Sequence, residues 1–199
     1  SSACEMVSEL LQYFGERLIG RSEANALMAG IALDTRNFVL RTGVRTFEAS
    51  AYLRSRGADP VEVKRMFSDS IEVYKERSSI VSSAEVYGNC AIAADSRKGA
   101  PRIAAAQAAD ELLSINGVDA SFVIYSAGDE INISARSLGT VNVQLIMESM
   151  GGGGHFTMAA AQLAGSTMDD AKTALLAAID RYHRTQAVPA AEDGMVAES

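Results

Sequence analysis

Hydrophobic positions spaced as on an α-helix dominate the first half of the chain. From residue 3 to residue 19 they predict an amphipathic helix. Ser22 is a suitable N-cap for a second helix to about Leu33, which is apolar on nearly every side and should therefore be buried. Further helices are predicted at residues 47–56, with Thr46 as cap, at 60–68, with Asp59 as cap, and at 69–83, whereas residues 38–40 form a short extended run.

The second half has the pattern of a mixed α/β domain. Strands are predicted at residues 86–94, 120–126 and 130–136, and helices at 102–114, 141–150, 157–164 and from Thr167 onwards. In the third strand apolar and polar residues alternate, so the apolar set should face the core and the polar set an open surface. The apolar set is Ile131, Ile133 and Ala135, and the polar set is Asn132, Ser134 and Arg136. We therefore expect an α/β fold with a loose tail from residue 185.

Four consecutive glycines, Gly151 to Gly154, stand immediately before His155. Because the run lies between two predicted helices and carries no side chains, its N–H groups could converge on an anion. The dipole of the helix expected from Thr157 would favour the same charge. His155 adds a titratable ring beside this hollow. A flexible glycine linker is the alternative, although no serines accompany the run.

Two other places carry candidate chemical groups. Arg136-Ser137 ends a predicted strand, and the planar guanidinium of Arg136 can hold a phosphate through two hydrogen bonds. Asp34 directly follows a helix expected to be buried, where a carboxylate has to be paired, hydrogen-bonded or bound to a metal. The structural alternative is that Asp34 caps a turn together with Thr35.

Composition restricts the partners and the compartment. The formal net charge of −7 argues against a protein that grips long nucleic acids through their phosphates, but it is compatible with a small anionic ligand held locally. Cys4 and Cys90 lack metal-type spacing and are expected to be reduced thiols. The longest apolar run, residues 26–33, is too short to cross a membrane, and no signal peptide opens the chain, so we expect a cytoplasmic protein.

Three motifs resemble the DHH phosphoesterases and their DHH-associated (DHHA) substrate-binding domain. The first combines ISARSLG (133–139) with VNV (141–143), and GGGGH (151–155). The second and third, GIALDTRNF (30–38) and RTGVRTFEA (41–49), are similar to the closing part of the DHH catalytic domain. Together with GVDASFVI (117–124), they are most similar to the GdpP-type cyclic-di-AMP phosphodiesterases of bacteria, over residues 1 to about 182.

The resemblance implies a phosphodiesterase that opens cyclic di-AMP to linear pApA, with two Mn²⁺ ions activating a bridging water. Asp34 matches one metal-ligand position of the family. The substrate-binding positions are matched by Arg136, Ser137, Gly152, Gly153, Gly154 and His155. No catalytic residue is assigned within this chain.

The same resemblance predicts how the chain is divided. Residues 1–82 would be the C-terminal portion of a DHH domain with a connector helix, residues 83–184 a DHHA-type mixed α/β domain, and residues 185–199 a disordered tail. The family's other metal ligands would precede Ser1, and one carboxylate cannot hold two ions, so the chain is expected to be inactive alone. Membrane-anchoring segments of the full-length protein are expected in that missing part, and a second copy of the chain is a candidate partner.

Two other functions are compatible with the same residues. A relative in the same family could cleave short linear oligonucleotides (nanoRNA), and the acidic net charge fits either small substrate. A DHHA-like domain is also appended to alanyl-tRNA synthetases, where it contacts RNA without chemistry, but Asp34 and the lack of a basic surface argue against such a module. A kinase-type phosphate loop is disfavoured because no Lys-Ser/Thr pair follows the glycines.

Overall fold

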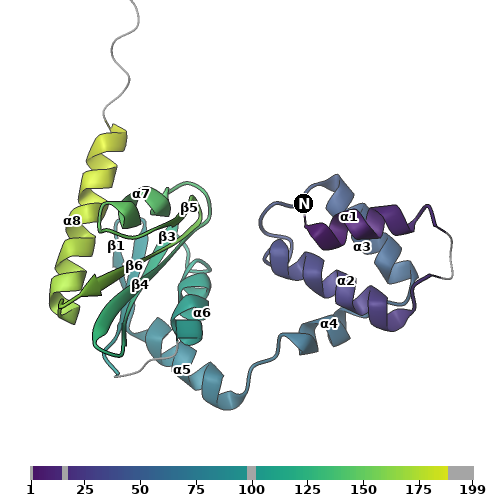
Figure 1. The fold of residues 1–199 in the computed structure, drawn as a ribbon, viewed down its shortest axis with the longest axis horizontal. Coiled ribbons are helices and arrows are strands. Elements are labelled where there is room, and N and C mark those ends of the chain that lie inside the picture. Colours follow the sequence, from purple (N-terminus) through teal and green to yellow (C-terminus); the bar gives the residue numbers. More distant parts are fainter. Residues whose placement is uncertain (1, 15–17, 98–101, 188–199) are drawn as a thin grey trace, which may run out of the picture. The chain divides into compact units, whose positions relative to one another are not determined.

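The computed structural model describes residues 2–14, 18–97 and 102–187. The chain forms two compact units, Ser1–Ser70 and Ile71–Ser199 (Figure 1). Helix 71–82, which was expected in the first domain, belongs to the second compact unit. The expected boundary near residue 82 between the DHH portion and the DHHA-type domain stays a prediction. Among the helices in the described ranges, none is long and apolar enough to cross a bilayer.

Helices pack around a small apolar core in the first unit. They are α1 (Ala3–Leu11), α2 (Arg21–Asp34), α3 (Val44–Ser55) and α4 (Pro60–Met66). One side of α2, with Met28 and Ile31, meets Leu53 of α3 in this core. The prediction that α2 is buried on nearly every side is wrong at Leu33, which is exposed because the helices contact only one side of α2.

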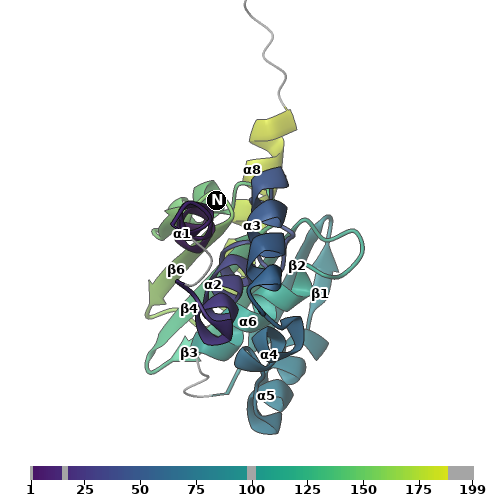
Figure 2. The ribbon, with the colours of Figure 1, turned by 90° about the vertical axis from the view of Figure 1, so that its right-hand side faces the viewer.

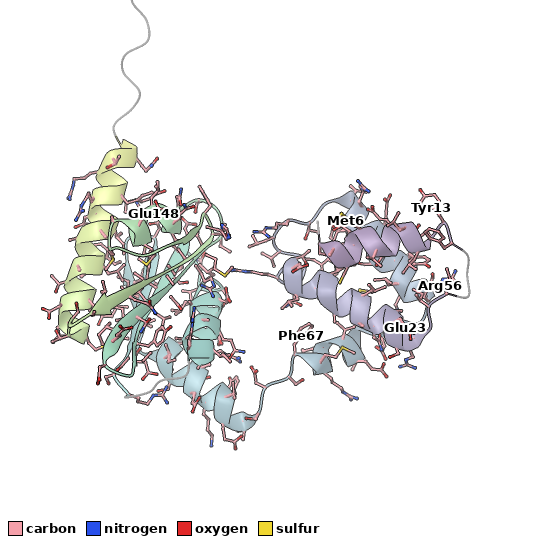
Figure 3. The ribbon with its side chains drawn as sticks, in the orientation of Figure 1. Met6, Tyr13, Glu23, Arg56, Phe67 and Glu148 are labelled. Atoms are coloured by element: carbon pink, nitrogen blue, oxygen red, sulfur yellow. The ribbon has the colours of Figure 1, made fainter. Side chains whose placement is uncertain are left out.

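Several helix ends differ from those expected. Helix α1 ends at Leu11 rather than at residue 19, and the next residues turn outward, with Tyr13 exposed (Figure 3). Helix α2 is capped by Gly20 rather than Ser22, because the Glu23 carboxylate accepts a hydrogen bond from the Gly20 N–H at 2.9 Å. Helix α3 likewise begins after Gly43, and the Thr46 hydroxyl accepts from the Gly43 N–H at 3.1 Å from within the first turn. Asp59 caps α4 as predicted, since its carboxylate accepts from the Val61 N–H at 3.0 Å.

Residues 38–40 form a turn and not the predicted extended run. Arg36, Asn37 and Phe38 all have positive φ, which non-glycine residues rarely adopt. The buried Thr35 holds this turn, because its hydroxyl donates to the Ile31 carbonyl at 2.7 Å and accepts from the Phe38 N–H at 3.0 Å. The hydrogen bonds of this buried hydroxyl, made to residues three and four positions away, have therefore overridden the preference of an apolar run for an extended backbone.

A six-stranded sheet is the centre of the second unit, with strand order β1-β2-β3-β4-β6-β5. The strands are β1 (Glu85–Tyr87), β2 (Cys90–Asp95), β3 (Ala120–Ala127), β4 (Glu130–Ser137), β5 (Gly153–His155) and β6 (Met158–Ala164). Only the β2–β3 pair is parallel, and α6 (Arg102–Leu112) makes the crossover between them. Strands β1 and β6 lie on opposite flanks of the sheet in Figure 2.

Helices cover both faces of this sheet, which gives three layers (Figure 1). On one face α7 (Val143–Glu148) and α8 (Met168–Ala187) pack against Phe122, Ile133 and Ala159. On the other face α5 (Ile71–Ser82) and α6 pack against Ala91 and Val123. The core is thus built on alternate residues of each strand.

Two strand assignments made from the sequence need correction. Residues 86–94 are not one strand but the hairpin of β1 and β2, with a turn at residues 88–89. Residues 158–164 are strand β6 and not a helix, and α7 is shorter than the predicted helix at 141–150. The alanines of this segment favour a helix locally, but pairing with β4 and burial of Ala159 and Ala161 decide for a strand.

The remaining elements agree with the pattern. Helix α6 and strands β3 and β4 lie where they were expected. Helix α8 follows Thr167, whose hydroxyl accepts from the Asp170 N–H at 3.2 Å as an N-cap. It runs to Ala187, beyond the expected start of the tail at residue 185, and residues 188–199 lie outside the described part.

The two cysteines are free thiols, and Cys90 is fully buried in the core between the sheet and helices α7 and α8. Burial, and secondarily the charge of Asp119, raise the pKa of the Cys90 thiol from 9.0 to about 11. We expect iodoacetamide at pH 8 to alkylate Cys90 roughly 100-fold more slowly in the native chain than in denaturant, because far less thiolate is present and the sulfur is covered. Peptide mass spectrometry over time measures this, and equal rates in both conditions would contradict the packing of β2.

Candidate functional site

The glycine run forms an edge strand and a turn, not a hollow before a helix. Gly153–His155 is strand β5, which pairs with β6 through a short hairpin. The predicted anion site at a helix N-terminus is therefore wrong, because the segment after the glycines is itself a strand. The alternative, a flexible glycine linker, is also wrong, since Gly153 and Gly154 pair with β6 and β5 packs against α7.

The glycines differ in what surrounds them. A Cβ on Gly152 would lie 2.2 Å from the Ala160 carbonyl oxygen, and the Gly152 N–H donates to the Met147 carbonyl at 2.8 Å. Gly154 has φ +152°, and a Cβ there would lie 2.5 Å from the Cα of Ala159. At Gly153 the described residues, apart from its two chain neighbours, place no atom within 4 Å of the same position, and the same holds for Gly151. Gly152 and Gly154 therefore allow the backbones to approach closely, whereas Gly153 and Gly151 border open space.

The strand register brings Arg136 and His155 onto one face of the sheet. Arg136 pairs with Met158, and Met158 pairs with His155, so the three residues form a row across β4, β6 and β5. Directly paired residues project to the same face. Two strand spacings of about 4.8 Å put the Cα atoms of Arg136 and His155 roughly 10 Å apart. A second row beside it carries small residues, because Ser134 pairs with Ala160 and Ala160 with Gly153.

The open and covered parts of this face meet at Arg136. His155, Met158 and Ala160 are exposed, whereas Arg136, Ser134 and Asn132 are buried. The expectation that the polar side of β4 is an open surface is wrong, because α6 lies across that strand. Alternation along a strand separates two faces but does not tell which of them another helix will cover.

The Arg136 guanidinium is held beneath α6. Its Nε lies 3.2 Å from Oδ1 of Asp110 on that helix, and Nη1 donates to the Ala135 carbonyl at 2.9 Å. The Arg136 side chain is 11% exposed and that of Asp110 is 43% exposed. A buried guanidinium needs such a counter-ion, and a half-exposed carboxylate can turn to water when an anionic ligand competes for the arginine.

Ser137 lies on the opposite side of the strand from Arg136. It is fully buried, and its hydroxyl accepts from the Gly139 N–H at 3.0 Å. Its own N–H donates to the Thr157 carbonyl at 3.0 Å, which ties the end of β4 to the β5–β6 hairpin. This geometry gives Ser137 a supporting role in the turn behind the row.

Asp34 ends α2 in the first unit and is exposed, contrary to the expectation of a buried carboxylate. The buried neighbour Thr35 fixes the backbone directly after it. Within residues 2–14, 18–97 and 102–187, no three histidine, cysteine or carboxylate side chains gather to hold a metal ion. These residues therefore do not make a metal site by themselves, although an exposed carboxylate can contribute one ligand to a shared site.

Comparison with known protein families identifies the second unit. Residues 87–185 match the model of the DHHA1 domain. This segment belongs to the DHHA1 domain family. The matched segment contains the whole row of Arg136, Met158 and His155, together with the β5–β6 hairpin.

Curated relatives extend the similarity beyond the DHHA1 domain. The chain is 48% identical over 188 residues to "Cyclic-di-AMP phosphodiesterase PdeA" of Listeria monocytogenes, and 46% identical over 188 residues to "Cyclic-di-AMP phosphodiesterase GdpP" of Bacillus subtilis. Each match covers 92% of this chain and 28% of the relative, so the chain spans less than a third of their length.

A solved structure supports the fold. An exopolyphosphatase-related protein from Bacteroides fragilis matches with a TM-score of 0.81 at 22% identity, over 92% of this chain and 57% of that one. At this identity the match shows the fold and no more. It agrees with the expected α/β class, in which helices of a DHH-type portion precede a DHHA-type domain.

Two neighbours of Arg136 in the candidate site were not identified from the sequence. Met158 was assigned to a helix, because the alanine-rich segment MAAAQLA (158–164) has no clear alternation that would have indicated a strand. Asp110 lies on a correctly predicted helix, but nothing in one sequence indicates which turn of a crossover helix meets Arg136.

Proposed function

We propose that this chain is the part of a metal-dependent phosphodiesterase that holds cyclic di-AMP for hydrolysis to linear pApA. The observation that carries the proposal is the row of Arg136, Met158 and His155 on one face of a DHHA1 domain, with the open backbone of Gly153 beside it. Relatives named cyclic-di-AMP phosphodiesterases that match 92% of the chain support the same substrate.

Each residue of the row has a role that follows from its chemistry. The guanidinium of Arg136 binds a phosphate oxygen in place of Asp110, and the His155 ring donates to the same nucleotide from the edge strand. Gly153 lets the ligand approach the backbone. Ser137, Gly152 and Gly154 hold the hairpin in this geometry. The reaction adds one water across one phosphodiester bond and leaves a terminal phosphate on pApA.

Hydrolysis of this type implies a divalent metal, and we propose two Mn²⁺ ions in the complete enzyme. Asp34 is the ligand that this chain contributes, and the remaining part of such an enzyme supplies the others. A metal would stabilise the charge that develops on the attacked phosphate. Because the described residues do not gather into a metal cluster, this chain is expected to bind the dinucleotide without hydrolysing it.

The proposed setting follows from charge and from the relatives. A net charge of −7 favours a cyclic or short linear dinucleotide over long nucleic acid. We place the domain in the cytoplasm, with any membrane anchor in the remaining part of the full-length protein. A homodimer is a further proposal, for which a second copy of the chain is the partner.

The substrate is tested by turnover. With the complete polypeptide and Mn²⁺, the proposal expects hydrolysis of cyclic di-AMP at a rate at least equal to that of linear dinucleotides. A preference for the linear substrates by more than tenfold would make the protein an oligonucleotide phosphodiesterase instead. Binding of tRNA at moderate salt, without any turnover, would favour a non-catalytic nucleic-acid-binding module.

Asp34→Ala separates metal chemistry from nucleotide binding. We expect turnover in the complete enzyme to fall below detection, because a metal ligand is lost, while the affinity of this chain for pApA stays within about twofold. The fold should tolerate the change, since Asp34 is exposed. Glu48→Ala, which removes another exposed carboxylate from the first unit, is the matched control and should keep full turnover. Normal turnover by Asp34→Ala would exclude Asp34 as a ligand.

A further inference from the structure

Met158 occupies the middle of the row between Arg136 and His155, and it is 46% exposed. Its two neighbours in the row are a guanidinium and an imidazole, both able to bind a phosphate. Met158 has an uncharged thioether that neither donates a proton nor carries charge. If Arg136 and His155 both contact the phosphate of one ligand, Met158 between them has to contact a part of that ligand other than the phosphate.

The residues next to Met158 on the exposed part of the sheet have short side chains or none. The adjacent row begins with Gly153 and Ala160, which have no side chain or a very short one, and ends at Ser134, which is buried. In the part of the chain that the structure describes, and apart from the two chain neighbours of Gly153, no atom lies within 4 Å of the position where a Cβ on Gly153 would stand. Met158 is therefore a flexible apolar side chain beside a flat floor of backbone and small residues.

We propose that Met158 is a specificity-determining residue that packs against the adenine base of the nucleotide whose phosphate Arg136 and His155 hold. This inference rests on the proposed function. A base is the flat, weakly hydrated part of a nucleotide, and it fits a floor of glycine and alanine. The methionine sulfur and methylene groups make favourable contacts with aromatic rings. The ribose, with its hydroxyl groups, gains little from a thioether, so the contact selects for the base.

The experiment compares a ligand that has a base with one that lacks it. The whole chain is titrated with AMP and with ribose 5-phosphate, and dissociation constants are measured by NMR chemical-shift perturbation. Met158→Ala is expected to weaken AMP binding roughly fivefold, within the range of sulfur–aromatic contacts, and to leave ribose 5-phosphate binding unchanged. Met158→Leu, which keeps the apolar volume, should restore most of the AMP affinity.

Met6→Ala is the matched control, because Met6 is a 52% exposed methionine on α1 in the other unit (Figure 3). It should change neither dissociation constant. The inference is overturned if Met158→Ala binds AMP as tightly as the wild type, or if it weakens AMP and ribose 5-phosphate equally. In both cases the proposed function stands as long as Arg136→Ala still loses binding of both ligands. Failure of the folded wild-type chain to bind either ligand would instead overturn the proposed function, and the role of Met158 with it.

Discussion

Gly154→Ala is expected to destabilise the second unit by about 3 kcal/mol or more, the range for a new steric clash at a strained backbone position. Gly154 has φ +152°, which alanine rarely adopts, and the added Cβ would lie 2.5 Å from both the Ala159 Cα and the Met158 carbonyl oxygen. These are backbone atoms of the paired strand, so they cannot move without breaking the β5–β6 hairpin. Urea unfolding followed by far-UV circular dichroism measures the loss.

Gly153→Ala is the control for this change, because it adds the same methyl group one residue earlier in the same strand. Apart from its chain neighbours, none of the described residues comes within 4 Å of the added Cβ, and the φ of Gly153 is not positive. The free energy of unfolding should therefore change by less than about 0.5 kcal/mol. Its nucleotide affinity should nevertheless fall, since the methyl group enters the proposed floor of the site. Equal stability of Gly154→Ala and Gly153→Ala would show that the hairpin does not have this packing.

Arg136→Ala is expected to weaken binding of pApA to the chain by roughly 1.5–3 kcal/mol, or about 10- to 150-fold, the range for a hydrogen bond to a charged group. The fold should survive, because the partner Asp110 is 43% exposed and can be hydrated once the arginine is gone. Calorimetric titration of the whole chain at low and high salt measures the loss. The wild-type affinity should fall with rising salt more steeply than that of the variant.

Arg77→Ala is the matched control for the arginine. Arg77 on α5 is 17% exposed, and its Nε lies 2.6 Å from Oε2 of Glu111, which is 39% exposed. The variant therefore loses an arginine of similar burial, paired with a carboxylate of the same helix α6, outside the row. It should bind pApA as the wild type does. An equal loss in both variants would mean that net charge, and not the position of Arg136, governs binding.

Local pattern was sufficient for much of the second unit. The alternation in residues 130–136, the helical spacing of residues 102–114 and the cap at Thr167 are short-range signals, and tertiary packing agreed with each of them. The motifs around Arg136 and the glycines also indicated the DHHA family before any geometry was known, because they are contiguous in sequence.

Tertiary structure decided which residues of those motifs share the sheet face of Arg136 and His155. Residues 158–164 are rich in alanine and were expected to be a helix, but pairing with β4 made them the strand that separates Arg136 from His155. The register then placed Met158 in the row. Ser137 faces the opposite side because it follows Arg136 directly in the same strand.

The sequence by itself determined the family, the α/β class and the presence of an arginine, a histidine and a glycine run in one domain. Only the tertiary structure decided that Gly152 and Gly154 are packed, that Gly153 is open, and that Asp110 covers Arg136. The physical reason is the distance along the chain over which each kind of interaction acts. Helix periodicity, capping and strand alternation act over a few neighbouring residues, whereas strand register and helix docking are set by the fit of segments that lie far apart in the chain.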